Sequence, residues 1–361
     1  MRPFLFLSLS LCHIAISATW QDASNDTRCV LSGPAGYSLL GSVRNCSNIV
    51  ISGLQVPAGQ TLDLTKLKNG TTVTFEGNTT WGYREWTGPL VSVSGTNISI
   101  KGAPGSALDG SGELWWDEKG QDGKQKPKFF QAHSLSNSAI EGIRIVNAPA
   151  HVFSINGCTN LTLANVTINS TLGDRLGKNT DGFDISASSN ITILWAMVYN
   201  QDDCVAINSG TDIVFRGGLC VGGHGLSVGS IGGRSNNAVK NVVFENSTIK
   251  NSQNGVRIKT KYGENGTVDA VTYRHIQLSN ITKYGIDVDQ SYGATGRAPT
   301  SGVKITNFSL ANVTGTVDSK ATRIFVNCGE TSCASWLWIG IAVAGGKKSS
   351  KCLYLPSGIV C

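Results

Sequence analysis

The stretch TNLTLANVTI, residues 159–168, is followed by a second one of the same kind, SNITILWAMV, residues 189–198. Both begin with polar residues and continue with alternating apolar, often β-branched side chains, which is typical of a strand that buries one face. Runs of this type recur along the whole chain: SNIVISG from Ser47, TNISIKG from Thr96, SAIEGIRI from Ser138, TDIVFRGG from Thr211, KNVVFENSTI from Lys240, VDAVTYRHIQL from Val268 and GVKITNFSL from Gly302.

Most successive runs begin about 20 to 40 residues apart, and helical periodicity is nearly absent. Gly accounts for 43 of the 361 residues and Asn is abundant, as expected where a chain turns sharply and visits positive φ. One such unit cannot bury its apolar face alone, but stacked coils bury a continuous core. The sequence therefore predicts an all-β fold, a right-handed parallel β-helix. A propeller needs a recurring tryptophan signature, which the eight scattered tryptophans do not supply.

The N-terminus predicts export. Residues 1–18 contain Arg2, an apolar run and small residues at the end, which is the pattern of a signal peptide. No later stretch approaches the roughly 20 apolar residues that span a bilayer. We expect a secreted protein without membrane association, whose residues 19–361 form one domain.

The cysteines fit an oxidising compartment. Nine of the ten remain after the expected cleavage, and the neighbours in sequence predict four disulfides. The remaining thiol, Cys158, lies in a strand-like setting and is expected to be buried. The predicted pairs are Cys29 with Cys46, Cys204 with Cys220, Cys328 with Cys333, and Cys352 with Cys361.

Fourteen N-x-[ST] sequons, among them Asn69, Asn78, Asn265 and Asn307, are present. Many lie in the repeated strand units, where the asparagine has a structural use, so we expect only a minority to carry glycan. The net charge is +6, without Lys/Arg runs or interleaved aromatics. This excludes a typical nucleic-acid binder and suits an anionic extracellular polymer.

Four aspartates mark a candidate site. Asp181 and Asp184 lie in NTDGFDI, and QDDCVAINSG brings Asp202 and Asp203. The interval from Asp181 to Asp202 equals that from Asp203 to His224, so these side chains are expected at equivalent places on successive coils, about 4.8 Å apart. Arg257, Lys259 and Tyr292 follow on later coils.

Crowded carboxylates repel, so at least one of them should hold its proton above the usual pKa of about 4. A protonated and an ionised carboxyl are the acid and the base of glycoside hydrolysis. Spacing alone does not separate retention from inversion. Each residue also has a structural interpretation, as a turn cap or a packing residue, and Asp184 keeps that interpretation.

At these residues the sequence resembles the polygalacturonases, family 28 of the glycoside hydrolases, and is most similar to the fungal-type endo-acting enzymes. Four motifs carry the resemblance in order: NTD at 179–181, QDD at 201–203, GGHG at 222–225 and RIK at 257–259. Tyr292 follows them. The similarity runs from about Cys29 to Cys361.

The resemblance implies random hydrolysis of α-1,4-galacturonan with inversion of configuration, without a metal or other cofactor. It assigns Asp202 as the general acid and Asp181 with Asp203 as the pair that activates water. His224 would support the acid, Arg257 and Lys259 would bind substrate carboxylates, and Asn179 and Tyr292 would position sugar. The expected partner is polygalacturonate, the candidate protein partners are plant polygalacturonase-inhibiting proteins, and a monomer is expected.

Three alternatives stay open at this level. An exo-acting pectin hydrolase would need loops that close one end of the cleft, and the pattern-breaking stretch 106–130 is predicted to be a long loop over one face. A pectate lyase would share the β-helix, but no EF-hand spacing or obvious metal-ligand set is present. A non-catalytic β-helix that binds pectin or an inhibitor is opposed by the complete set of aspartates.

Overall fold

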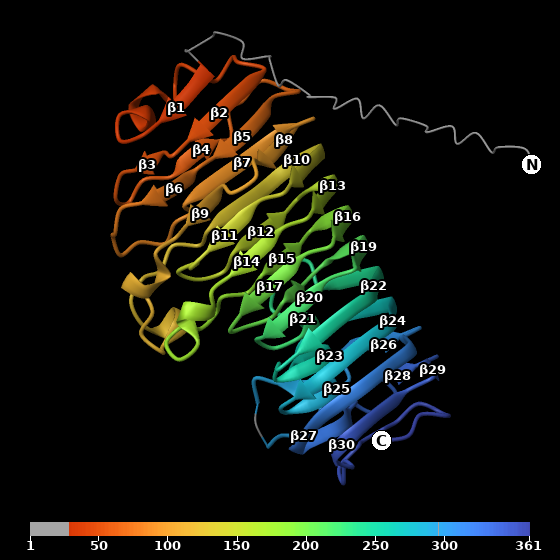
Figure 1. The fold of residues 1–361 in the computed structure, drawn as a ribbon. Helices are drawn as coiled ribbons and strands as arrows, with labels where there is room; N and C mark the ends of the chain where they lie inside the picture. The colour runs from red at the N-terminus through yellow and green to blue at the C-terminus, as the bar shows by residue number, and fades with distance from the viewer. Residues whose placement is uncertain (1–28, 295) are drawn as a thin grey trace, which may run out of the picture.

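The structure, a computed structural model, describes residues 29–294 and 296–361. The predicted signal peptide, residues 1–18, lies outside these residues. The described chain is a stack of short parallel strands that winds from β1 at one end to β30 at the other (Figure 1). The prediction of an all-β parallel β-helix is confirmed.

The strands form three columns, in each of which a strand pairs with its neighbours one coil before and after. Four long strands, β10, β22, β24 and β27, bend from one column into the next. Column 1 contains β4 (Leu62–Leu64), β7 (Val91–Thr96), β10 (Phe130–Glu141), β12 (Phe153–Asn156), β15 (Phe183–Ser186), β18 (Val205–Ile207), β21 (Leu226–Ile231), β23 (Asn254–Lys261), β25 (Tyr284–Tyr292) and the end of β27 (Ser309–Asn327).

The other two columns complete each coil. Column 2 contains β1 (Val30–Ser32), β2 (Asn48–Ser52), β5 (Thr72–Glu76), β8 (Ser99–Gly102), β13 (Thr159–Ala164), β16 (Ser188–Leu194), β19 (Gly210–Arg216), the starts of β22 (Ala238–Lys250) and β24 (Gly266–Ile281), β26 (Val303–Thr306), β28 (Cys333–Ala334) and β29 (Leu337–Ile339). Column 3 contains β3 (Gln55–Val56), β6 (Asn78–Trp81), β9 (Ala107–Asp109), β11 (Arg144–Val146), β14 (Thr167–Asn169), β17 (Met197–Asn200), β20 (Leu219–Gly222) and β30 (Ala342–Lys347).

The coils differ in length because the turns between columns differ. Thr159 pairs with Ser189 one coil later, whereas Ser188 pairs with Gly210, so the second of these coils is clearly the shorter. Such variation agrees with the uneven spacing of the apolar runs in the sequence. The helical residues of the described chain that join these strands are short 3-10 turns: η2 (Gly36–Leu39), η3 (Gly112–Leu114), η4 (Gly120–Asp122) and η5 (Thr171–Gly173).

The core is a set of side-chain stacks that run along the helix axis. Phe130, Phe153 and Phe183 stack on successive coils of column 1, with ring centroids 5.0 and 5.3 Å apart. Each is fully buried, which stabilises the fold by about 2 to 3 kcal/mol per ring. Because these rings fix column 1 from inside, the polar residues next to them are held at fixed positions outside.

Asparagines occupy many corners of the coils in the left-handed conformation. Asn160 and Asn190 have φ of 54° and 53°, and the amide of Asn190 donates to Asn160, which donates in turn to Asn137. Such ladders give sequon asparagines a structural use, as the sequence predicts. Which sequons carry glycan stays a prediction.

The four predicted disulfides are all present: Cys29–Cys46, Cys204–Cys220, Cys328–Cys333 and Cys352–Cys361. Cys158 is a buried free thiol whose Sγ donates to the carbonyl of Ala132 at 3.0 Å. Its pKa is raised by burial, so it is a packing residue rather than a nucleophile.

The predicted loop 106–130 needs a correction of its bounds. Its first residues form β9 and its last begins β10, which leaves an irregular stretch from 110 to 129 with two 3-10 turns. Leu108 and Phe130 are core residues of these strands, which is why the loop is shorter than its polar composition suggested. Within the described residues, no helix is both long and apolar enough to cross a bilayer.

Candidate active site

One position recurs on column 1, two residues before the first core side chain of each strand. Backbone hydrogen bonds connect this position from coil to coil: Phe129 N–H donates to the carbonyl of His151, Val152 N–H to Asp181 and Gly182 N–H to Asp203. This row, from here on the corner row, contains Lys128, His151, Asp181, Asp203, His224 and Asn254.

The register corrects one expectation. Phe183 pairs with Val205, so Asp181, two positions before Phe183, lies level with Asp203 rather than with Asp202. Asp203 and His224 are level with each other, as predicted, since Val205 pairs with Leu226. Asp202 lies in the turn just before this row. The turn before β18 thus contributes two carboxylates, and only Asp203 is in register with Asp181 on the neighbouring coil. The equal sequence intervals did not reveal this difference.

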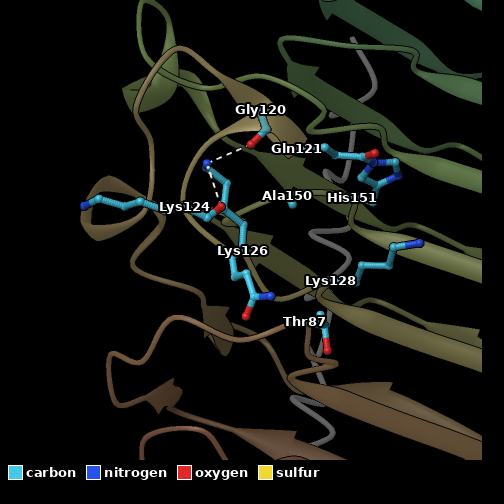
Figure 2. Close-up of a pocket in the computed structure, with 9 residues that line it drawn as sticks. Thr87, Gly120, Gln121, Lys124, Lys126, Lys128, Ala150 and His151 are labelled. Atoms are coloured by element: carbon cyan, nitrogen blue, oxygen red, sulfur yellow. Dashed lines mark hydrogen bonds between the residues drawn. The ribbon is translucent and has the colours of Figure 1, made fainter.

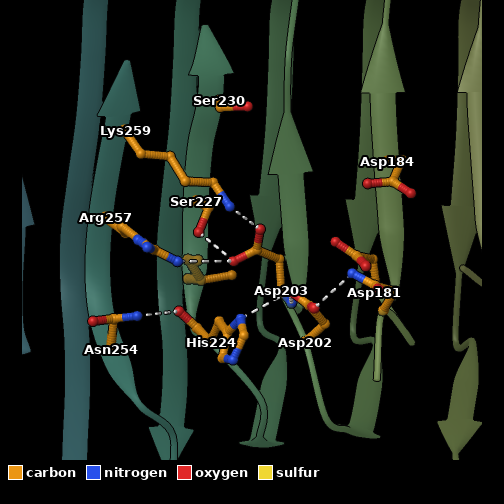
Figure 3. Close-up of polar contacts among 12 residues, drawn as sticks. Asp181, Asp184, Asp202, Asp203, His224, Ser227, Ser230, Asn254, Arg257 and Lys259 are labelled. Atoms are coloured by element: carbon orange, nitrogen blue, oxygen red, sulfur yellow. Dashed lines mark hydrogen bonds and ion pairs between the residues drawn. The ribbon is translucent and has the colours of Figure 1, made fainter. Parts of the chain in front are cut away.

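Asp203 is buried and surrounded by donors (Figure 3). Lys259 Nζ contacts its Oδ2 at 2.5 Å, Ser227 Oγ donates to its Oδ1 at 2.6 Å, and Arg257 Nη1 lies 3.8 Å from Oδ1. Burial alone would lower the pKa of Lys259, but the negative charge of Asp203 outweighs it and raises the pKa. Lys259 therefore stays charged beside Asp203.

Asp202 forms a second pair with His224. Nδ1 of His224 lies 2.8 Å from Oδ1 of Asp202, which also accepts the backbone N–H of Asp203 at 2.8 Å. Burial would raise the pKa of Asp202, but the hydrogen bond and charge of His224, together with the charge of Lys259, lower it to about 2. Asn179 Nδ2 donates to the other oxygen, at 3.4 Å.

Asp181 lacks a cation of its own. Its Oδ1 is buried and has no hydrogen-bond partner among the residues that the structure describes, and the nearest basic atom, His151 Nδ1, is 3.8 Å away. Burial raises its pKa well above the ordinary value, and the negative charges of Asp184, Asp202 and Asp203 raise it further. Asp181 is therefore the carboxyl of this cluster whose pKa is raised by burial and crowding.

Arg257, Lys259 and Tyr292 lie on the C-terminal side of these carboxylates. The guanidinium of Arg257 and the ammonium of Lys259 are 5.5 and 5.3 Å from the ring centroid of Tyr292, within the range of cation–π contacts. The structure thus brings together the eight predicted residues: Asn179, Asp181, Asp202, Asp203, His224, Arg257, Lys259 and Tyr292.

Sequence reasoning missed Asp287, which orients Arg257. Arg257 Nε donates to Asp287 Oδ2 at 3.1 Å, and the two residues are in register on β23 and β25. Burial raises the pKa of Asp287 to about 6, although Arg257 opposes the shift. The sequence interval from Arg257 to Asp287 corresponds to one coil. Coil lengths vary too much, however, for this interval to be recognised without the structure.

The raised pKa of Asp287 predicts a pH-dependent loss of stability. Between about pH 4 and pH 6 the carboxyl is protonated in the folded chain but ionised in the unfolded one. The free energy of unfolding should therefore fall as pH rises through this window, by at most about 3 kcal/mol from this group. Denaturant titrations of the wild type and of Asp287→Asn should show a shallower fall in the variant. Equal slopes would contradict the assignment.

His151 and Asp184 form a further missed contact. His151 Nδ1 lies 2.7 Å from Asp184 Oδ2, and its Nε2 lies 2.7 Å from the side-chain amide of Gln121. Gln121 belongs to the loop 110–129, and its backbone N–H donates to Asn179 Oδ1 at 3.1 Å. The loop therefore rests on the carboxylate cluster, and Asp184 holds the histidine between them rather than only capping a turn.

Two groups of side chains have donor atoms close enough to share a metal ion. One is His151, Asp181 and Asp184, and the other is Asp202, Asp203 and His224; within each group the atoms lie within 4.8 Å of one another. In the second group Lys259 and Arg257 already neutralise Asp203, which favours charge compensation by the protein. The expectation of a metal-free site stays a prediction.

Comparison with known proteins places this arrangement in a family. The model of glycosyl hydrolases family 28 matches residues 46–361. The chain is 56% identical to "Endopolygalacturonase I" of Aspergillus aculeatus over 342 residues, which is 94% of this chain and 90% of that one. It is 58% identical to "Polygalacturonase" of Cochliobolus carbonum over 322 residues, 88% of each chain.

A solved structure agrees in fold. Endopolygalacturonase I from Stereum purpureum, complexed with two galacturonate, superimposes with a TM-score of 0.81 at 34% sequence identity, over 92% of this chain and 100% of that chain.

Proposed function

The chain belongs to family 28 of the glycosyl hydrolases, and from that premise we propose that it is a secreted endopolygalacturonase that hydrolyses demethylated pectin with inversion of configuration. It is a glycoside hydrolase. The observation that carries the specific proposal is the triple carboxylate cluster of Asp181, Asp202 and Asp203, with Arg257 and Lys259 beside it.

The charges of the site fit a uronic acid polymer. Galacturonan carries a carboxylate on each sugar, and a planar guanidinium can bind one through two parallel hydrogen bonds. Asp287 binds Nε of Arg257, and Asp203 lies 3.8 Å from Nη1, so the guanidinium is held in place beside the carboxylate cluster. We assign Arg257 and Lys259 to substrate carboxylates, and Tyr292 and Asn179 to the sugar rings.

The acid function belongs to Asp202 together with His224. A glycosidic oxygen can only accept a hydrogen bond, so it favours the protonated form of the carboxyl that faces it. Nδ1 of His224 lies 2.8 Å from Oδ1 of Asp202 and orients this carboxyl. The pKa of Asp202 is lowered to about 2 in the free chain, so the bound sugar must raise it before Asp202 can act as the acid.

The base function belongs to Asp181 and Asp203. In the free chain the pKa of Asp181 is raised and that of Asp202 is lowered, which is the reverse of what the assigned roles require at the moment of reaction. A water molecule that donates to Asp181 would stabilise its ionised form, while a bound sugar removes solvent from Asp202 and raises its pKa. We propose that substrate binding reverses the order, so that the proton leaves Asp181 for Asp202. Asp203, fixed by Lys259, then helps to hold the water.

A time course on demethylated polygalacturonate tests the activity. We expect new reducing ends with mixed oligomers at the earliest times, unaffected by chelators and without unsaturated, ultraviolet-absorbing products. Monomer from the start would indicate an exo-acting enzyme, and unsaturated products a lyase. If the wild type releases no reducing ends while it binds the polymer, the proposal is wrong and the binding protein is the better description.

The proposal also covers the export, domain organisation, oligomeric state and protein partners of the chain. We propose export by the signal peptide of residues 1–18, one catalytic domain from residue 19 to 361, and action as a monomer. The four disulfides support an oxidising compartment. Plant polygalacturonase-inhibiting proteins are the proposed protein partners. Mass spectrometry of the mature N-terminus tests the first of these points directly.

A further inference from the structure

The corner row continues beyond the catalytic cluster toward the N-terminal end of the β-helix. Starting from Asp181, the next positions on successive coils are His151 and Lys128. Neighbouring strands are about 4.8 Å apart, so Lys128 lies about 10 Å along the axis from Asp181. Arg257 lies on the opposite side of the cluster, on β23. Basic side chains therefore lie on both sides of the carboxylates along the axis, with Lys128 on the row and Arg257 on β23 beside it.

Lys128 and His151 line a cavity of about 330 Å³ (Figure 2), and Nδ1 of His151 lies 3.8 Å from Oδ1 of Asp181. The loop 110–129 forms one wall and the corner row the other. Three lysines and a histidine line it, and no carboxylate does: the lining residues include Thr87, Gln121, Lys124, Lys126, Lys128 and His151. Such a lining is complementary to a negatively charged ligand.

Only one of these lysines is free. Lys126 Nζ is bonded to Asp117 and to the carbonyl of Gly120, both at 2.8 Å, so it braces the loop. Lys124 Nζ donates to the carbonyl of Leu114. Lys128 Nζ has no hydrogen bond or ion pair within the part of the chain that the structure describes. Lys128 is exposed and lies on the same corner row as Asp181 and Asp203. Its ammonium is therefore available to a ligand that binds along this row.

We propose that Lys128 binds the carboxylate of a galacturonate unit that lies beyond the cleaved bond, on the side away from Arg257 and Lys259. The proposal rests on the proposed function and adds a specificity-determining residue to it. A sugar ring is comparable in length to the coil spacing, so a polymer laid along the row presents successive carboxylates to successive coils. Substrates long enough to reach Lys128 gain a charge-assisted hydrogen bond that shorter ones lack.

The test compares Lys128→Gln with the wild type on oligogalacturonates of increasing length that carry a label at one end. For oligomers long enough to reach Lys128 we expect kcat/KM to fall by about tenfold, and the preferred cleavage position to move along the chain. For the shortest oligomers that are still cleaved we expect no change. Lys101→Gln is the matched control, because it removes the same charge from an exposed position of column 2.

Three outcomes would overturn the inference: wild-type rates at all lengths, the same loss at all lengths, or an equal loss in Lys101→Gln. In all three outcomes the wild type still cleaves oligogalacturonates, so the proposed function would stand while the role of Lys128 would not. If the proposed function were wrong, the wild type itself would cleave no oligomer. Melting temperatures of both variants should equal that of the wild type, because among the described residues no side chain has a hydrogen bond or ion pair with Lys128 to lose.

Discussion

Replacement of Asp202 by asparagine is expected to lower kcat on polygalacturonate by about a thousandfold, with binding of the polymer largely kept. The amide has nearly the shape of the carboxyl group and can still contact His224, but it cannot give a proton to the leaving oxygen. Binding should be retained because Arg257 and Lys259 are unchanged. The measurements are initial rates from reducing ends and affinity for polygalacturonate by calorimetry.

Asp174→Asn is the matched control for this prediction, since Asp174 is an exposed aspartate in the turn after η5. It should retain wild-type rates. A variant Asp202→Asn that kept more than a tenth of wild-type kcat would rule out Asp202 as the acid. The raised pKa of Asp181 would then make Asp181 the better candidate for that role.

The second large effect is expected from Lys259→Met, which removes the cation from Asp203. Asp203 is 1% exposed, so its charge would be left buried with only Ser227 and the more distant Arg257 to compensate it. Breaking a buried ion pair in this way costs about 3 to 5 kcal/mol. We expect a loss of that size in the free energy of unfolding, measured by urea denaturation, together with loss of activity.

A double variant separates stability from catalysis. Lys259→Met combined with Asp203→Asn removes both charges, so most of the lost stability should return while activity stays absent. Lys250→Met, an exposed lysine on β22, controls for the loss of one positive charge and should unfold like the wild type. If Lys259→Met is as stable as this control, the pair does not hold the site together.

The fold follows from local chemistry that the sequence displays. The apolar runs of columns 2 and 3 alternate clearly, because one face packs inside and the other meets solvent, and their spacing already defines coils. Cysteines that are close in the sequence form the four disulfides, because closing a short loop costs little conformational entropy. These features depend on neighbours along the chain, so they could be predicted without the structure.

The strands that carry the site were harder to recognise. β15 and β18 are too short for an alternation to stand out, and each follows directly on a polar turn. Asp181 and Asp203 are nevertheless marked by a common feature, since each stands two positions before a core side chain. His151 and Lys128 share this feature on the two preceding coils.

The contacts across coils could not be derived from intervals. Successive coils differ in length because their turns differ, so the assumption of one fixed interval put Asp202 level with Asp181, although Asp203 has that place. Gln121 reaches Asn179 from a loop that is distant in the sequence. Such contacts depend on how a long loop folds back, which no local pattern encodes.

The most direct test of the central claim is the configuration of the first product. Proton NMR during the first minutes of hydrolysis reports the anomer at each new reducing end before mutarotation. If Asp181 and Asp203 direct a water molecule to the face opposite Asp202, the α-linkage must give the β-anomer first. Appearance of the α-anomer first would contradict the account, because it would require a covalent intermediate on one of these aspartates.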